Sequence, residues 1–335
     1  MEREGTKSFR QNSNGGLASA APYVLCGIVL VLLPLFVSQY FQTMMTKVFI
    51  FAILAMSLNL IFGYAGLVSL GHAAYFGVGA YTTGMLILRL GIKSFWLAAP
   101  GGVLMSIVFA ALFGVIALRF SGVYFLMITF ALGELLFSAA WKWRSMTGGD
   151  DGLWGIPAPE LGLSWLSWNR TCFYYLAFLV LVVSFLALYR IIKSPFGRTL
   201  IGIRENETRM RSLGYNALAF KYLAFVLAGL FAGVAGVLFA YFRGFVSPSN
   251  LGIETSGLVL FIVIIGGSGT LCGPLIGTLF ILLLEHFSSI YFPERWPMLL
   301  GFVFIVVAAY LQGGIGIYLV RLWDCLRYRH TGVMC

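Results

Sequence analysis

The sequence predicts an all-α fold, a polytopic bundle of transmembrane helices with about 8–10 spans. The first observation is composition, because 60% of the 335 residues are hydrophobic and only 10% are charged, whereas soluble domains carry roughly 25% charged residues. The second is pattern, since the apolar runs are continuous and not alternating, which favours helices over a transmembrane barrel. The third is the 40 glycines, which let membrane helices approach one another closely.

The expected elements follow the apolar runs in chain order. We expect continuous spans at about residues 22–40, 44–62, 95–118, 122–140, 172–190, 222–242 and 298–319. A glycine-rich stretch over 63–89 and a tryptophan-rich polar loop over 141–170 lie between them. Tryptophans are common at the membrane–water interface, so the loop is expected to lie at the bilayer surface.

The basic residues predict the orientation. The net charge is +10, and basic loops of membrane proteins remain in the cytoplasm. With an amino tail over 1–20 inside, six crossings bring the chain back to the cytoplasm at its most charged internal loop, residues 193–221. We therefore expect a single transmembrane domain over 21–320 and a basic cytoplasmic tail over 321–335.

The stretch 254–286 is expected to be broken or re-entrant. As one helix, its 33 residues would be roughly 50 Å long, well beyond a membrane core of about 30 Å. A single crossing would also place the basic tail outside, against the positive-inside rule. The break at Gly266–Gly269 and Gly273-Pro274 is therefore predicted to face the interior of the bundle, where irregular backbone is tolerated.

Several functional classes are not expected. The charges form no continuous stripe, so the expected surroundings are a lipid bilayer and not a nucleic acid. The five cysteines lack metal-ligand spacing, so no metal site is predicted. The sequence holds no G-x-x-x-x-G-K-[ST] motif and no catalytic grouping. We therefore expect a protein that is not an enzyme and that binds no cofactor itself.

The run 59–72 places small and polar residues within an apolar context. One interpretation is close helix packing, which small residues permit. The other is a broken helix that lines a translocation path. In the second interpretation the candidate path residues, from this run and from the later glycine-rich break, are Asn59, Ser69, His72, Gly267 and Gly269.

The charged loop 193–221 is predicted to hold one short helix. Pro195 disfavours helix in the residue before it, and a helix over 198–213 would pair Glu205 with Arg209 one turn later. Gly214 is a suitable terminator. The helix is interpreted either as a solvated connector or as a docking site for a soluble partner.

Four segments of the chain resemble the LivM-type permeases, the membrane subunits of ABC importers for branched-chain amino acids. The segments lie in the family's order over about residues 45–285: Asn59–Tyr81, the Thr147–Pro157 segment, the Ser194–Asn216 run with its Ile-Arg-Glu-Asn-Glu core, and the Gly-Gly-Ser-Gly-Thr segment that begins at Gly266. The resemblance implies a multi-pass protein of the bacterial inner membrane.

The resemblance also implies partners and contact residues. The partners would be a second homologous permease subunit, two cytoplasmic ATP-binding subunits and a periplasmic solute-binding protein, with ATP used by the partner subunits. The loop 193–221 would be the coupling loop that fits the ATPase, and Gly148–Gly152 would face the binding protein. The residues carried over as coupling contacts are Gly197, Arg204, Glu205, Asn206, Leu213 and Gly214.

The solute and the transport class have alternatives. Permeases for urea, short-chain amides and aromatic compounds resemble this family closely. The Gly-Ile-Pro at residues 155–157 leans by analogy towards branched-chain or other hydrophobic amino acids. A secondary transporter or channel is the alternative of another class, and it would need ion-coupling groups of its own.

Overall fold

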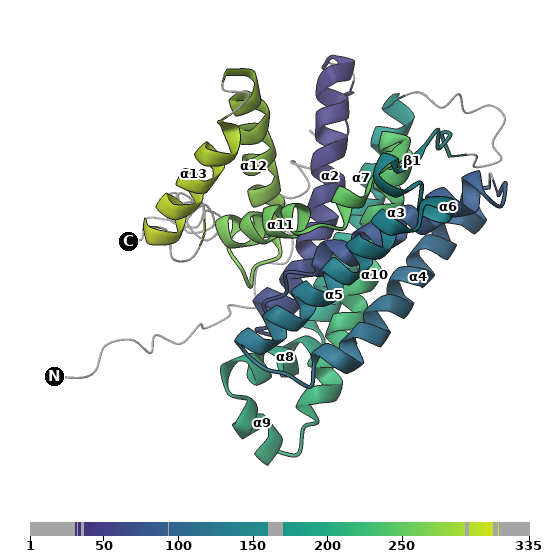
Figure 1. Cartoon of the computed structure of the whole chain (residues 1–335). Coiled ribbons are helices and arrows are strands. Elements are labelled where there is room, and N and C mark those ends of the chain that lie inside the picture. The colour runs from purple at the N-terminus through teal and green to yellow at the C-terminus, as the bar shows by residue number, and fades with distance from the viewer. Residues whose placement is uncertain are drawn as a thin grey trace, which may run out of the picture.

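The structure is a computed structural model that describes residues 31, 33, 34, 37–92, 94–159, 170–291, 295–310 and 314. Within these residues, seven helices are long and apolar enough to cross a membrane. The predicted all-α membrane bundle is therefore confirmed. Most of the expected first span, the end of the last span and both predicted tails lie outside the described residues. Figure 1 shows α8 and α9 together at one end of the bundle, which we call the α9 end; the opposite end is the α6 end.

Helix α2 (Gln39–Asn59) forms the centre of the bundle and continues as a π-helix, η1, over Leu60–Tyr64. The segment Gln39–Tyr64 is the most buried of the seven long apolar helices, and α2 contacts α7, α10, α11 and α12. It begins at Gln39, earlier than the expected residue 44. Apolar side chains all round a helix are typical of a helix enclosed by others.

Helices α3 (His72–Leu88), α4 (Phe95–Ala117) and α10 (Ala217–Arg243) pack tightly against one another. A Cβ atom added at Gly233 would lie 2.5 Å from the Ser106 Cβ, so small residues set this spacing. The Ser106 hydroxyl donates to the Tyr75 carbonyl across 2.8 Å. The glycine-rich stretch 63–89 thus contains a full helix of its own, α3.

Helices α5 (Val123–Lys142) and α7 (Arg170–Lys193) lie at the periphery. Each presents large apolar side chains outward, among them Val123, Tyr124, Met127, Leu179, Val183 and Leu186. In a helix long enough to span a bilayer, such a face contacts lipid.

The α6 end contains short elements between the long helices. They are α6 (Arg144–Thr147), the 3-10 helix η2 (Gly149–Asp151), and strand β1 (Leu153–Trp154), which pairs antiparallel with β2 (Phe245–Val246). A second 3-10 helix, η3 (Pro248–Asn250), follows β2. Gly148, Gly149 and Gly152 have positive φ angles of 79°, 65° and 69°. The predicted polar loop is therefore ordered over 144–159.

The carboxyl-terminal part consists of α11 (Ile253–Gly266), α12 (Cys272–Tyr291) and α13 (Trp296–Tyr310). The chain is interrupted between α11 and α12, as the glycines predict. In Figure 1, α11 runs across the bundle while α12 runs towards the end where α2 begins. Helix α12 contacts both α2 and α11.

Candidate functional site at the two helix breaks

The first break follows α2 and comprises residues 60–71. The π-helix η1 ends at Tyr64, Gly66 has a φ angle of 73°, and the Leu67 amide donates to the Ile61 carbonyl across 2.9 Å. π-Helical turns are rare and are frequent at functional sites. The chain then runs without regular structure until α3 begins at His72.

Ser69 and His72, two predicted path residues, lie inside the protein. Their exposed fractions are 0% and 1%. His72 Nε2 lies 2.7 Å from the Ser57 hydroxyl, and the next amide, that of Ala73, donates to the Ser256 hydroxyl across 3.1 Å. In this conformation the start of α3 is packed against α2 and α11, so these two side chains face protein and not an open path.

The second break is the turn 267–271 between α11 and α12. Gly267 and Gly269 have φ angles of 103° and 83°, a region that favours glycine. The Thr270 hydroxyl donates to the Gly267 carbonyl across 3.0 Å and accepts from the Gly273 amide across 3.2 Å. Glycine conformation and one threonine therefore define this turn.

Asn59 joins the two breaks. Its side-chain nitrogen donates to the Thr270 carbonyl across 2.9 Å, and its side-chain oxygen accepts from the Gly269 amide across 3.0 Å. The exposed fraction of Asn59 is 0%. A Cβ atom added at Gly63 would lie 3.0 Å from the Gly269 Cα. The structure thus brings Asn59 against the turn that contains Gly267 and Gly269. His72 pairs with Ser57 instead, and the buried Ser69 hydroxyl has no hydrogen-bond partner among the described residues.

The charged loop forms two helices, so the prediction of one helix over 198–213 is wrong. They are α8 (Pro195–Glu205) and α9 (Glu207–Ser212). Asn206 interrupts them with extended backbone, and its side-chain oxygen accepts the Arg209 amide across 2.9 Å. An asparagine that caps a helix start competes with continuation of the preceding helix.

The expected Glu205–Arg209 pairing is replaced by a cluster around Glu207. The Glu207 carboxylate contacts Arg211 at 2.6 Å and Lys221, at the start of α10, at 2.5 Å. Partial burial raises the pKa of this carboxyl, but hydrogen bonds and charge from Lys221 and Arg211 outweigh burial and hold the pKa below its usual value. The ion pair between Glu207 and Lys221 therefore holds helix α9 against α10.

The remaining predicted coupling residues lie in two environments. Gly197 is buried, and a Cβ atom there would come within 2.6 Å of the Ile192 Cα. Glu205, Asn206 and Gly214 are exposed, and so is Leu213, at 66%. Gly214 has a φ angle of 88°. Leu200 and Ile203 face inward from α8 and are buried, so α8 is held on the bundle by its apolar side.

Arg204 connects the charged loop to the first break. Its Nη1 donates to the Gly63 carbonyl. A Cβ atom added at Gly66 would lie 2.8 Å from the Arg204 Cγ, and one added at Gly269 would lie 3.2 Å from Nη1. This contact was not predicted from the sequence, because the two residues are 141 positions apart. The glycines at 63, 66 and 269 are the signal that something packs closely there.

Two further contacts join α2 to α12 nearer the start of α2. Lys47 Nζ lies 3.1 Å from a Glu285 carboxylate oxygen, and the Tyr40 hydroxyl lies 2.9 Å from the His286 ring. The exposed fractions of the Lys47 and Glu285 side chains are 30% and 22%. Ionisable residues in membrane spans are costly and usually paired, and this pairing was also missed.

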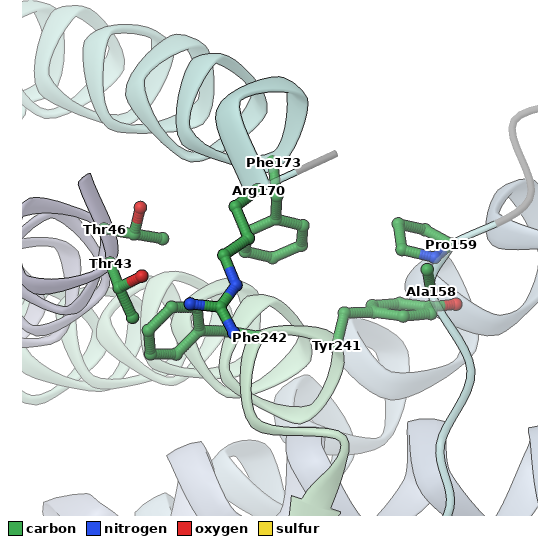
Figure 2. Close-up of a pocket in the computed structure, with 8 residues that line it drawn as sticks. All are labelled: Thr43, Thr46, Ala158, Pro159, Arg170, Phe173, Tyr241 and Phe242. Atoms are coloured by element: carbon green, nitrogen blue, oxygen red, sulfur yellow. The ribbon is translucent and has the colours of Figure 1, made fainter. Parts of the chain in front are cut away.

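A small cavity lies where α2, α7 and α10 approach one another. Its volume is about 270 Å³, and Figure 2 shows Arg170 extending from α7 towards α2 and α10. The lining residues are Thr43, Thr46, Ala158, Pro159, Arg170, Phe173, Tyr241 and Phe242. The cavity therefore combines aromatic rings and hydroxyls with one guanidinium group.

Together these features define a class, polytopic helical membrane proteins with interrupted helices that meet inside the bundle. A family model described as the branched-chain amino acid transport system / permease component matches residues 40–308. This match covers most of the chain, and the chain belongs to that family.

Several curated proteins are similar to the chain. The high-affinity branched-chain amino acid transport system permease protein LivM of Escherichia coli K12 is 34% identical over 259 residues, 71% of this chain and 61% of that protein. LivH of Salmonella typhimurium LT2 is 24% identical over 276 residues, covering 77% and 87%. The autoinducer 2 import system permease protein LsrC of Klebsiella pneumoniae is 26% identical over 223 residues, covering 64% and 61%. The chain thus spans about 61% of the length of the LivM relative. No solved structure matches the chain.

Proposed function

We propose that this chain is the membrane-spanning subunit of an ATP-driven importer that carries branched-chain or other hydrophobic amino acids across the bacterial inner membrane. The observation that carries the proposal is the membership in the permease family over residues 40–308. The similarity to LivM and LivH, both branched-chain amino acid permeases, favours that solute class. The similarity to LsrC leaves a second solute class as an alternative to be tested by competition.

The complex would contain a second homologous permease subunit, two cytoplasmic ATP-binding subunits and a periplasmic solute-binding protein. The partner subunits would use the ATP, and this chain would bind no cofactor of its own. The similarity to both LivM and LivH supports a pair of related permease subunits. The amino terminus and the α9 end would then face the cytoplasm, which agrees with the basic residues of α8 and α9.

The docking surface for the ATP-binding subunits would lie on α8 and α9. The buried side of α8 holds it to the bundle, while Glu205, Asn206 and Leu213 remain exposed. Gly197 permits the close approach to α7 that sets the position of α8, and Gly214 turns the chain after α9. An apolar leucine with an exposed fraction of 66% beside charged residues fits the centre of a protein interface.

The opposite surface, at the α6 end, would face the solute-binding protein. The turn Gly148–Gly152 is fixed by three positive-φ glycines and by the β1–β2 pairing. Asp150 and Asp151 are exposed on this turn. A rigid, exposed acidic turn is suited to a transient partner with basic groups, because complementary charge increases the association rate.

The two helix breaks would lie along the translocation path when the transporter opens. Asn59 bonds the turn that contains Gly267 and Gly269, while Ser69 lies within the first break and His72 follows it, both buried. In the described conformation Asn59 bonds the turn 267–271, and Ser69 and His72 are buried, so the path would be closed here. Opening would expose their polar groups to the solute, as expected of interrupted helices in transporters.

The test is transport by the assembled complex in proteoliposomes. A tagged chain is purified with its associated subunits from native membranes, reconstituted, and supplied with the binding protein outside and ATP inside. We expect uptake of labelled leucine that needs ATP hydrolysis and is competed by isoleucine and valine but not by urea. Uptake that follows an ion gradient without ATP would overturn the proposal. Competition by urea alone or by autoinducer 2 alone would overturn the solute assignment.

A matched pair of variants tests the docking surface. Leu213→Asp should lose the ATP-binding subunits on purification, because a charge replaces the exposed apolar contact. Leu218→Asp is the control, since Leu218 is also exposed, at 51%, but lies on α10 beyond the α9 turn. Equal loss in both variants, or retention in Leu213→Asp, would contradict the placement of the surface.

A further inference from the structure

One side chain, Arg204, touches both helix breaks and the charged loop at once. Its Nη1 donates to the Gly63 carbonyl of the first break. The same nitrogen would lie 3.2 Å from a Cβ atom at Gly269 of the second break, and its Cγ packs on Gly66. A side chain at Gly66 or at Gly269 would approach the space that Arg204 uses, whereas one at Gly63 would meet Asn59 and Gly269 instead. Gly66 and Gly269 therefore leave room for the arginine side chain beside the Gly63 carbonyl.

The Gly63 carbonyl is a suitable partner for a guanidinium group. Gly63 belongs to the last turn of α2 and its π-helical extension, which ends at Tyr64. The last four carbonyls of a helix have no partner within it, and the helix dipole adds negative potential at that end. A charged donor there satisfies a carbonyl and is also favoured electrostatically, whereas a neutral donor would satisfy the carbonyl alone.

Arg204 stands on a helix whose position is well defined. Leu200 and Ile203 on α8 are buried, at 0% and 2% exposed, and α8 contacts α7, α10 and the π-helix. Arg204 is near the end of α8, two residues before the interruption at Asn206. A displacement of α8 by a few ångströms would therefore carry the guanidinium away from the Gly63 carbonyl.

The second break depends on the first. Asn59 holds the Gly269 amide and the Thr270 carbonyl of the turn 267–271. Gly314, further along the chain, also packs against this turn, since a Cβ atom there would lie 2.9 Å from the Gly266 carbonyl carbon. Asn59 lies one helical turn before Gly63, so a movement of Gly63 changes the surroundings of the Asn59 side chain. Because Asn59 bonds the turn 267–271, this change also affects that turn.

We infer that Arg204 is a positioning residue that fastens α8 to both helix breaks, so that movement of α8 releases the contact between Asn59 and the turn 267–271. This inference rests on the proposed function for the source of that movement, the ATP-binding subunits on α8 and α9. It assigns Arg204 to transmission within this chain, in contrast to the docking contact that the family resemblance implies for it.

The first experiment uses the purified full-length chain alone, so it does not depend on any partner. Backbone hydrogen exchange is measured by mass spectrometry in wild type, Arg204→Ala, Arg204→Lys and Asn59→Ala. We expect exchange in 64–71 and 267–271 to rise at least about tenfold in Arg204→Ala. Asn59→Ala should raise exchange in 267–271 and leave α8 unchanged. Arg204→Lys should be intermediate, because it keeps the charge and loses the planar fork.

Arg209→Ala is the matched control, because Arg209 is an exposed arginine in the same charged loop, on α9. It should leave exchange in both breaks at the wild-type rate. Unchanged exchange at both breaks in Arg204→Ala would overturn the inference. An increase of the same size in Arg209→Ala would also overturn it, because the effect would then follow the loss of any nearby basic charge.

The second experiment uses the assembled transporter and separates transmission from docking. In Arg204→Ala we expect normal co-purification of the ATP-binding subunits and at least about a tenfold rise in ATP hydrolysed per solute imported, which corresponds to a loss of coupling. Loss of co-purification would assign Arg204 to the docking surface and overturn the inference. If no ATP-binding subunit is found with the wild type, the proposed function fails while the exchange result still decides whether Arg204 fastens the breaks.

Discussion

The two ends of α2 are joined to the carboxyl-terminal helices by different chemistry. Near its start, α2 reaches α12 through side-chain pairs, Lys47 with Glu285 and Tyr40 with His286. Near its end, the Asn59 amide and the Gly63 carbonyl bond to backbone and to Arg204. The Lys47 side chain is 30% exposed, whereas Asn59 is 0% exposed. We call the first the solvated junction, because its ion pair is partly exposed, and the second the sealed junction, because Asn59 is buried there although Arg204 beside it is exposed.

This difference indicates which junction can open easily. A partly exposed ion pair can exchange its partner for water or for a charged solute at small cost wherever water reaches it. Separating Asn59 from the turn 267–271 would leave buried backbone groups without partners, which costs about 1–3 kcal/mol for each group. The sealed junction therefore needs work to open. It is also the junction that α8 contacts through Arg204, where that work would arrive.

Gly63→Ala tests the sealed junction most strongly. The added Cβ atom would come within 3.0 Å of the Gly269 Cα and would press on the Asn59 side chain. Overpacking against backbone cannot be relieved by a rotamer change, so we expect destabilisation of about 3 kcal/mol. The measurement is the thermal unfolding midpoint of the purified chain in detergent, followed by tryptophan fluorescence.

Gly257→Ala in α11 is the control, because nothing lies within 4 Å of a Cβ atom added there. It should match wild type or unfold at a slightly higher temperature, since alanine favours helix over glycine. Equal midpoints for the two variants would show that the first break tolerates a side chain and that the junction is looser than these contacts indicate.

The sequence predicts the breaks better than the contacts between them. Composition and continuous apolar runs are enough to predict a helical membrane protein, and the glycines are enough to predict the interruption in 254–286. Both predictions succeed because these features depend on residues close together in the sequence. The contact between Asn59 and the turn 267–271 joins residues 210 positions apart. Residues so distant in sequence leave no periodic signal. Polar residues such as Asn59 therefore appear as candidates without their partners.

The charged loop shows why a local rule can still fail. A favourable spacing of Glu205 and Arg209 predicts one helix, but Asn206 caps a new helix instead. Lys221 on α10 pairs with Glu207, so Glu207 takes the place of Glu205 as the acidic member of the ion pairs in this loop. Tertiary contacts outweigh a helix pairing worth only about 0.3–0.5 kcal/mol. The two-helix form places Arg204 at an end of α8, where its side chain can reach the first break.

The solvated junction is tested by removing its charges singly and together. Glu285→Gln leaves Lys47 without its carboxylate partner inside a membrane span. We expect a loss of about 1–2 kcal/mol, between the values for exposed and fully buried pairs. The double variant Lys47→Met with Glu285→Gln should recover most of the loss, because no unpaired charge remains. Thermal midpoints of the three variants and wild type form a double-mutant cycle.

The outcome of that cycle decides how solvated the junction is. Losses of the single variants that simply add in the double variant would mean that Lys47 and Glu285 do not interact, and the contrast between the two junctions would fail. Raising the salt concentration should weaken the coupling of an accessible pair. A coupling that salt leaves unchanged would place the pair in a drier environment than its exposed fractions indicate.

The smallest expected effect comes from the ionic cluster at the α9 end. Variants of this cluster test whether the strength of a junction depends on its exposure to water or on its place in the fold. Glu207, on α9 outside the membrane spans, pairs with Arg211 and with Lys221 at the start of α10, and these partners hold its pKa below the usual 4.5 despite partial burial. A carboxyl with a lowered folded-state pKa stabilises the fold above its unfolded pKa, and this contribution is lost as the pH falls through the folded value. We therefore expect Glu207→Gln to lower stability at pH 7 by less than about 1 kcal/mol.

The pH dependence separates the ionic contribution from the loss of side-chain contacts. The stability difference between wild type and Glu207→Gln should shrink below about pH 4 and vanish once the carboxyl is protonated in both states. Glu205→Gln is the matched control, an exposed carboxylate two residues earlier, and should show little difference at either pH. A difference for Glu207→Gln that persists at low pH would mean that hydrogen bonding without charge clasps α9 to α10. The α9 end would then resemble the sealed junction at Asn59 more than the solvated one at Lys47, and its position in the fold would matter more than exposure to water.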